Sequence, residues 1–283
     1  MDLAVEVEGL HYTYRDGTEA LRGLSLSIPR GSRVAIMGPN GAGKSTFLLH
    51  LNGLYLPQKG RVQVLGREVN ARTARELRSL VGLVFQDPDD QVFSPTVYED
   101  VAFGPLNMGL PPEEVAGRVK EALLAVGMWD HRERHPSRLS YGQKKRVAIA
   151  GVLAMGPEII ALDEPMAYLD PQGKEALLEI LGRLHARGVT ILVATHDVDM
   201  AAAWADHVII MKEGRVLARG EPSLLAREDL VREAGLGLPL VTRIFCALPE
   251  LELPFLPYTC EQAVRVLREK LLADKNAGHA GIG

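Results

Sequence analysis

Residues 38–46, GPNGAGKST, constrain the fold of this chain more than any other part of its sequence. They follow a short apolar run at residues 34–37 and precede a segment with helical periodicity, which predicts a turn from a strand into a helix. Gly38, Gly41 and Gly43 can adopt conformations closed to other residues, so successive N–H groups can curl around an anion at the helix N-terminus. The pattern predicts a phosphate-binding loop, whereas a glycine-rich turn that carries a lysine by chance is the alternative interpretation.

Two side chains at the end of this loop predict the kind of phosphate that it binds. Lys44 can reach the β- and γ-phosphates of a nucleotide, and the Ser45 hydroxyl can ligate Mg²⁺. The sequence therefore predicts a nucleotide site with a magnesium ion.

Composition sets limits on the class of protein. The chain has 283 residues, of which 47% are hydrophobic and 24% charged, enough for one large α/β domain and a smaller appendage. Its net charge of −4 provides no overall basic field, so we expect no nucleic-acid partner. No apolar run approaches the roughly 20 residues of a membrane span, and the first residues are acidic where a signal peptide would be basic. We therefore expect a cytoplasmic protein whose membrane role, if it has one, comes through other chains.

Cys246 and Cys260 are the only cysteines, too few for a disulfide framework or a cysteine-rich metal site. We expect both to be free, buried thiols.

Strands and helices alternate along most of the chain. An antiparallel flap is predicted from residues 4–9 and 24–28 around a turn at 15–18. Periodicity then predicts helices at 44–52, 112–126, 171–187 and 261–273, strands at 60–65, 80–85, 158–162 and 189–194, and a hairpin of 207–211 with 215–218. The βα rhythm ends near residue 221, and we expect residues 275–283 to be disordered.

Polar residues follow two of the apolar strands. Asp163 ends one strand beside the phosphate loop, where it can support Mg²⁺ directly or through water. Glu164 comes next and can act as a general base for a water that attacks the γ-phosphate. His196 follows the next strand and can hydrogen-bond the γ-phosphate or that water. Surface acids at a strand end and a structural histidine are the alternative interpretations.

Two further features complete the set. Gln86 follows the strand at 80–85, and its amide can ligate Mg²⁺ or water. Ser140 and Gln143 form a capping box ahead of a helical face, and with Gly142 they predict a second anion site at a helix N-terminus. One chain cannot easily fold this second site onto its own phosphate loop.

In chain order, the motifs are the phosphate loop, Gln86, LSYGQ at 139–143, ALDEP at 161–165, Asp170 and His196. This order resembles that of the ATPase subunit of an ATP-binding cassette (ABC) transporter, and the resemblance covers residues 4–225. The resemblance implies a P-loop NTPase of the α/β class, with a RecA-like parallel core and an N-terminal antiparallel β subdomain. It also implies a helical signature-motif subdomain at about 87–155 and a C-terminal extension at 226–283 that assists dimerisation.

The resemblance implies ATP and Mg²⁺ as cofactors. The implied nucleotide ligands are Tyr14, Gly38, Asn40, Gly41, Ala42, Gly43, Lys44, Ser45, Thr46, Ser140, Gly142, Gln143 and Asp170. Tyr14 matches the aromatic residue that stacks on adenine, although a strand tyrosine packed on its neighbours is the alternative. The implied metal ligands are Ser45, Gln86 and Asp163, and the implied catalytic residues are Glu164, His196 and Gln86.

The same resemblance implies a head-to-tail dimer, in which Ser140 and Gly142 of one subunit contact the γ-phosphate held by Lys44 of another. A homodimer is favoured because the motifs are complete. Tyr141 replaces the usual second glycine of LSGGQ and Ala167 replaces the usual serine, but neither change removes a charge or a phosphate ligand. Tyr141 is expected to point away from the phosphate.

Residues 87–110 and the segment LSYGQKKRVAIAGVLAM resemble the energy-coupling-factor importers, particularly the cobalt and nickel type called CbiO. This implies a peripheral subunit at the cytoplasmic face of the cell membrane. In such relatives the loop after the glutamine receives a helix of the membrane subunit, for which Phe93, Asp89 and Asp90 are candidates. An exposed polar loop is the alternative, and a vitamin importer is the alternative for the cargo.

Other functions fit less well. A small-molecule kinase would have no use for LSYGQ or Glu164. A soluble ABC protein acting on ribosomes or DNA would typically carry two cassettes or a coiled-coil insertion, which this chain lacks. His131 and His135 are interpreted as solvated residues, and the basic run at 144–146 as facing water or nucleotide.

Overall fold

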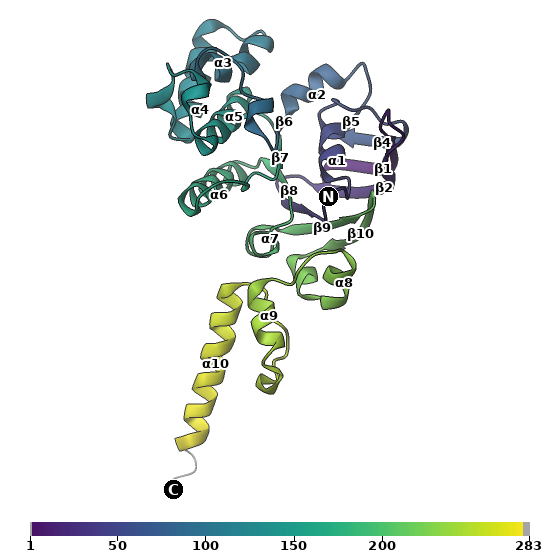
Figure 1. Cartoon of the computed structure of the whole chain (residues 1–283), viewed down its shortest axis with the longest axis vertical. Coiled ribbons are helices and arrows are strands. Elements are labelled where there is room, and N and C mark those ends of the chain that lie inside the picture. Colours follow the sequence, from purple (N-terminus) through teal and green to yellow (C-terminus); the bar gives the residue numbers. More distant parts are fainter. Residues whose placement is uncertain (1, 280–283) are drawn as a thin grey trace.

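A six-stranded sheet runs through the centre of the molecule and leads into the phosphate loop (Figure 1). The computed structural model describes residues 2–279. Along the sheet the strand order is β10-β9-β3-β8-β7-β6, in which β10 is antiparallel to β9 and the other neighbours are parallel. Its strands are β3 (Arg33–Met37), β6 (Val81–Val84), β7 (Ile159–Asp163), β8 (Thr190–Thr195), β9 (His207–Lys212) and β10 (Arg215–Gly220).

A second, antiparallel sheet covers one side of this core. Its order is β2-β1-β4-β5, and it confirms the predicted N-terminal flap. The strands are β1 (Leu3–Thr13), β2 (Glu19–Pro29), β4 (Lys59–Val64) and β5 (Arg67–Glu68).

Helices complete the P-loop NTPase fold that the sequence predicts. α3, α4 and α5 pack on one another to form the helical part at one end of the molecule, and α6 and α7 follow strands of the central sheet (Figure 1). The bounds are α1 (Lys44–Leu51), α2 (Ala74–Leu80), α3 (Val97–Asn107), α4 (Pro112–Ala125), α5 (Tyr141–Met155), α6 (Pro171–Ala186), α7 (Val198–Trp204), α8 (Glu228–Glu233), α9 (Leu240–Cys246) and α10 (Cys260–His279). Short 3₁₀ helices lie at Pro88–Asp90, Trp129–His131, Pro136–Arg138, Pro222–Ala226 and Pro249–Leu251.

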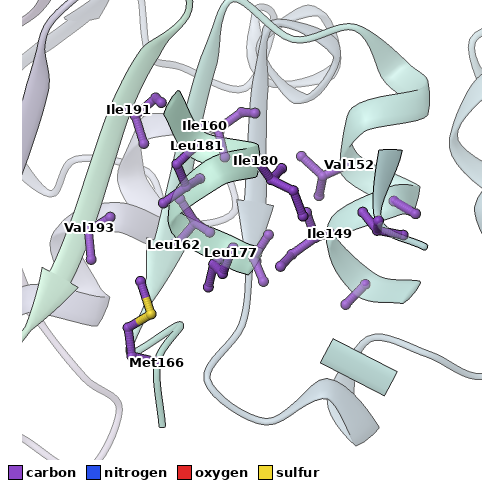
Figure 2. Packing of buried hydrophobic residues seen from close by; sticks show 14 of the residues in the cluster. Ile149, Val152, Ile160, Leu162, Met166, Leu177, Ile180, Leu181, Ile191 and Val193 are labelled. Atoms are coloured by element: carbon purple, nitrogen blue, oxygen red, sulfur yellow. The ribbon is translucent and has the colours of Figure 1, made fainter. Parts of the chain in front are cut away.

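The central sheet separates two hydrophobic clusters, because successive side chains of a strand point to opposite faces. In β7, Ile160 and Leu162 belong to the cluster that holds α3–α6, whereas Ile159 and Ala161 belong to the cluster beneath the antiparallel sheet. Figure 2 shows the first cluster, in which side chains from α5, α6, β7 and β8 meet. The apolar runs of β7 and β8 are buried on both faces, as the sequence predicts for parallel strands.

The C-terminal part departs from the expectations in two places. Cys246 and Cys260 are exposed, so the expectation of buried thiols is wrong. α10 continues to His279, so residues 275–279 are helical rather than disordered, and residues 280–283 lie outside the described part. α9 and α10 project away from the rest of the molecule (Figure 1). Among residues 2–279, no helix is long and apolar enough to cross a bilayer.

Candidate nucleotide and metal site

Three neighbouring strands of the central sheet bring the predicted site residues to one edge. Met37, the last residue of β3, pairs with Thr195 of β8, and Ala194 pairs with Asp163 of β7. Because the strands are parallel, the phosphate loop, His196 and Glu164 all leave the sheet at the same level. The sheet register therefore places residues that lie up to 158 positions apart in the sequence (38 to 196) in one site.

The phosphate loop has room for glycine only at two of its positions. At Gly38 (φ 150°), a Cβ atom would lie 2.2 Å from the carbonyl oxygen of Met211. At Gly43 (φ 97°), it would lie 2.7 Å from the carbonyl oxygen of Ala20. A side chain at either position would displace the neighbouring backbone, so the loop conformation depends on both glycines. Asn40 and Gly41 are exposed at the tip of the loop, and Ala42 is buried beneath it.

Lys44 is buried at the first position of α1. Its Nζ donates hydrogen bonds to the carbonyl oxygens of Gly38, at 2.8 Å, and Pro39, at 3.1 Å. Burial lowers the pKa of Lys44, and the carboxylates of Glu164 and Asp163 oppose that shift. The ammonium group therefore lies inside the loop and within the field of both strand-end acids, where a nucleotide phosphate would neutralise it.

Ser45, Gln86 and Asp163 line one cavity of about 330 Å³. Burial raises the pKa of the Asp163 carboxyl, while a hydrogen bond from the Ser45 hydroxyl and the charge of Lys44 act in the opposite direction. A hydroxyl, an amide oxygen and a carboxylate are the hard oxygen ligands that Mg²⁺ prefers. The donor set thus fits a magnesium ion, which would neutralise part of the charge of a bound nucleotide.

Glu164 and His196 are in contact at the end of β7 and β8. Nδ1–H of His196 donates to Oε1 of Glu164 at 2.8 Å, and the Thr195 hydroxyl donates to Oε2 at 3.3 Å. Glu164 has a positive φ of 43°, which is uncommon for a residue with a side chain and is held here by its N–H bond to Ala194. The carboxylate is buried and oriented from both sides, as a general base requires.

Tyr14 lies in an aromatic cluster next to the loop. Its hydroxyl shares a hydrogen bond of 2.7 Å with the Thr46 hydroxyl, and its ring meets those of Tyr12 and Tyr55 edge to face. The three tyrosines line a cavity of about 650 Å³ together with Leu54 and Leu56. This arrangement offers a ring surface on which a nucleotide base can stack.

The capping box predicted at the start of α5 is present. The Gln143 N–H donates to the Ser140 hydroxyl, and the Ser140 N–H donates to the Gln143 side chain. Asp170 caps α6 by accepting a hydrogen bond from the Gly173 N–H at 2.7 Å. Within residues 2–279, no hydrogen bond joins Ser140 or Gly142 to the phosphate loop of the same chain.

Sequence reasoning missed a buried lysine. Lys145 was expected to face water or nucleotide, but its side chain is fully buried and donates to the carbonyl oxygens of Phe85 and Gln86. Burial lowers its pKa to about 8, and Asp163, Asp87 and Glu164 oppose that shift. A signal was available, because Lys145 shares a helical face with buried residues three, four and seven positions later (Ala148, Ile149 and Val152).

Comparisons with known proteins agree with this geometry. The family model described as "ABC transporter" matches residues 21–167. The energy-coupling factor transporter ATP-binding protein EcfA of Carboxydothermus hydrogenoformans is 56% identical over 87% of this chain and 91% of its own length. The protein of the same name from Methanocaldococcus jannaschii is 50% identical over 85% of this chain and 87% of its length.

Two solved structures are also similar. The structure of cbiO1 from Clostridium perfringens, described as part of the ABC transporter complex cbiONQ, has a TM-score of 0.74 and 42% identity, covering 88% of this chain and 99% of that one. The ATP-binding cassette MJ0796, a dimer in a post-hydrolysis state bound to ADP and phosphate, has a TM-score of 0.69 and 32% identity, covering 77% of this chain and 98% of that one. The chain therefore belongs to the ABC transporter family, as a Mg²⁺-dependent, ATP-hydrolysing subunit of the energy-coupling-factor type.

Proposed function

We propose that this chain forms an ATP-dependent dimer that closes on ATP, reopens after hydrolysis, and so drives the membrane subunits of an importer. The observation that carries this proposal is the Glu164 carboxylate, which is held by His196 and Thr195 at the strand ends beside Lys44 and Asp163. In this arrangement Glu164 takes the proton of the attacking water, and His196 fixes the carboxylate that takes it. Lys44 binds the β- and γ-phosphates, and Ser45, Gln86 and Asp163 hold the metal.

The second half of each ATP site comes from the partner subunit in this proposal. Ser140 and the N–H groups at the start of α5 can bind an anion, because a helix N-terminus carries unpaired donors and partial positive charge. These groups make no hydrogen bond to the phosphate loop of their own chain within the described residues. A head-to-tail dimer would place them on the γ-phosphate held by Lys44 of the second copy, and the dimeric state of the similar cassette MJ0796 supports this.

The loop after Gln86 is the proposed contact with the membrane subunits. Phe93 is 66% exposed and Phe103 is 50% exposed, and their rings pack edge to face at 5.1 Å. Asp89 forms an ion pair with Lys144 of α5, whereas Asp90 lines the cavity that also contains Gln86. An exposed aromatic pair beside acidic residues fits a helix that has apolar and basic side chains.

The C-terminal extension is proposed to assist dimerisation. Leu240 and Ile244 on α9, and Val264, Leu267 and Leu271 on α10, are all between 42% and 63% exposed. Their spacing of three and four residues places them along one face of each helix. Such a stripe is costly to leave in water, and burial against a second subunit would remove that cost.

The cargo is proposed to be a micronutrient, with cobalt or nickel as the first candidate. The similarity to cbiO1, described as part of the complex cbiONQ, favours this cargo. A vitamin is the alternative cargo, because the name EcfA that other relatives carry specifies no metal. The distinction belongs to the membrane partners and not to the ATP site.

Glu164→Gln is the variant that tests the catalytic assignment. We expect ATP hydrolysis to fall by about 10²- to 10⁴-fold, because an amide cannot take a proton from water, while ATP binding is kept. The measurements are phosphate release and nucleotide affinity of the purified chain. Glu158→Gln serves as the matched control, since Glu158 precedes the opposite end of β7 and pairs with Arg30. Near-normal phosphate release by the Glu164→Gln protein would contradict the assignment.

Purification of the tagged chain in mild detergent from its native membranes tests the transport assignment. A small integral subunit together with a metal-importer component would support the cobalt or nickel proposal. A vitamin-binding membrane component would keep the mechanism and change the cargo. Recovery without any membrane protein would argue against an importer.

A further inference from the structure

Lys145 is a charged side chain that ATP hydrolysis, as described above, does not use. It lies in the second turn of α5 and is fully buried, with its Nζ 2.9 Å from the carbonyl oxygen of Phe85 and 2.7 Å from that of Gln86. Burying an ammonium group is costly unless its donors are bonded, and an apolar residue here would leave two carbonyls without this partner. The position therefore requires a side chain that can donate to both carbonyls.

The backbone around Gln86 is held from several sides. Its carbonyl oxygen also accepts a hydrogen bond of 3.1 Å from the Tyr141 hydroxyl, so both lone pairs are used. The Gln91 side chain accepts from the Phe85 N–H and donates to the Leu83 carbonyl, which closes the segment on the other side. The Gln86 side chain, in contrast, is exposed and lines the cavity that contains Ser45 and Asp163.

This network joins two parts of the molecule. Phe85 and Gln86 directly follow β6 of the central sheet, whereas Tyr141 and Lys145 belong to α5, which packs with α3 and α4. A shift of α5 relative to β6 would pull on the Gln86 carbonyl through two hydrogen bonds, and so would turn the side chain on the same residue.

We propose that Lys145 is a positioning residue for ATP hydrolysis, which holds the carbonyls of Phe85 and Gln86 so that the Gln86 side chain faces the metal side of the nucleotide. The inference rests on the proposed role of Gln86 as a ligand of Mg²⁺ or water. Tyr141, the departure from the usual glycine, supplies the second bond to the same carbonyl and strengthens the same link.

A double-mutant cycle tests whether Lys145 acts through Gln86. Lys145→Met removes all three donors and keeps an unbranched stem of similar length. With Gln86 present, we expect the turnover rate at saturating ATP to fall by about 10- to 100-fold and the MgCl₂ concentration for half-maximal activity to rise, as for other groups that orient a metal ligand. In a Gln86→Ala background, Lys145→Met should have little further effect, because the side chain that it positions is gone.

Two controls separate positioning from loss of packing. Val152→Ala removes two methyl groups from a buried side chain of the same helix, which faces Gly82 of β6. This variant should lower thermal stability without changing the magnesium requirement. Lys145→Gln keeps two N–H donors but removes the charge, and should recover part of the turnover rate that Lys145→Met loses. ATP affinity in magnesium-free buffer should be unchanged in the Lys145 variants, because the phosphate loop is intact. If Lys145→Met does not fold, Lys145→Gln takes its place in the cycle.

The outcomes distinguish the positioning role of Lys145 from the proposed role of Gln86 on which it rests. If Gln86→Ala alone leaves turnover and the magnesium requirement unchanged, Gln86 is not a ligand and both statements fail. If Gln86→Ala is impaired but the Lys145 effect is the same with and without Gln86, only the positioning role is overturned. The positioning role is also overturned if Lys145→Met and Val152→Ala lower the turnover rate equally when each variant is assayed the same number of degrees below its own melting temperature.

Discussion

Two substitutions of Tyr14 can separate the contribution of ring stacking to ATP binding from that of its hydrogen bond. Tyr14→Ala removes the ring, and base stacking worth about 1–3 kcal/mol should weaken ATP binding by about 5- to 150-fold. Tyr14→Phe keeps the ring and loses only the bond to the Thr46 hydroxyl, for which we expect at most about a tenfold loss. Titration with a fluorescent ATP analogue measures both. Equal affinities for the Ala variant and the wild type would show that the base binds elsewhere.

At the scale of residues, the sequence predicted the location of those site residues that follow directly from the ends of parallel strands. Asp163, Glu164 and His196 could be brought together in advance because parallel strands end at one edge of a sheet. Lys145 could not be placed in the same way, because its position in a run of three basic residues suggested a solvated surface. Only the apolar residues that share its helical face revealed that it is buried.

At the scale of elements, an ion pair fastens the start of β3 to the turn before β9. Asp206 accepts hydrogen bonds from the backbone N–H of Arg33, at 2.8 Å, and from its guanidinium, at 2.7 Å. Burial alone would raise the pKa of the Asp206 carboxyl, but the hydrogen bonds and charge of Arg33 outweigh it and lower the pKa below its ordinary value. The bond therefore contributes to stability above the pKa of the unfolded chain, about 3.9, and is lost as the pH falls through the lower folded pKa.

Asp206→Asn should accordingly reduce stability at pH 7. The difference from the wild type should shrink as the pH falls below about 5, because the wild-type carboxyl then gains a proton on unfolding. Urea unfolding at several pH values measures this difference. Glu179→Gln on the exposed side of α6 is the control, and a difference that does not vary with pH would contradict the assignment.

Elements with a regular apolar pattern were predicted from sequence, and short or interrupted ones were not. α4, α6, β7 and β8 lie within two residues of their predicted ends. α3 was missed because Gly104 and Pro105 interrupt it, although the capping box of Thr96 and Glu99 marks its start. The end of α10 was set too early, because a few glycine and polar residues suggested disorder where the helix continues.

At the scale of the whole molecule, the central question is how two copies meet. We expect Ser140→Ala combined with Gly142→Asp to prevent the ATP-dependent dimer, because the new carboxylate would face the γ-phosphate of the partner subunit. The measurement is gel filtration with ATP in the Glu164→Gln background, where hydrolysis does not dissolve the dimer. Gly117→Asp adds the same charge at an exposed site of α4 and should leave the dimer intact. A dimer that persists in the double variant would refute the contact between subunits.

The order of motifs along the sequence predicted the family and the layers of the fold, but not the direction of the C-terminal helices. The Leu240 N–H donates to Asp199 and so joins α9 to α7, and the Thr242 hydroxyl donates to the Pro257 carbonyl and so joins α9 to the segment before α10. Neither contact leaves a recognisable pattern in the sequence.

The hydrophobic cluster that α3–α6 share limits which fragments of the chain can fold alone. Val119 and Val147 of the helical part lie in one cluster with Ile160 and Leu177, which come from β7 and α6. A fragment of residues 87–155 would carry only part of its own interior and would expose the rest to water. Excised alone, it should form a collapsed, loosely packed chain, so the helical part cannot be transplanted into another protein without the sheet.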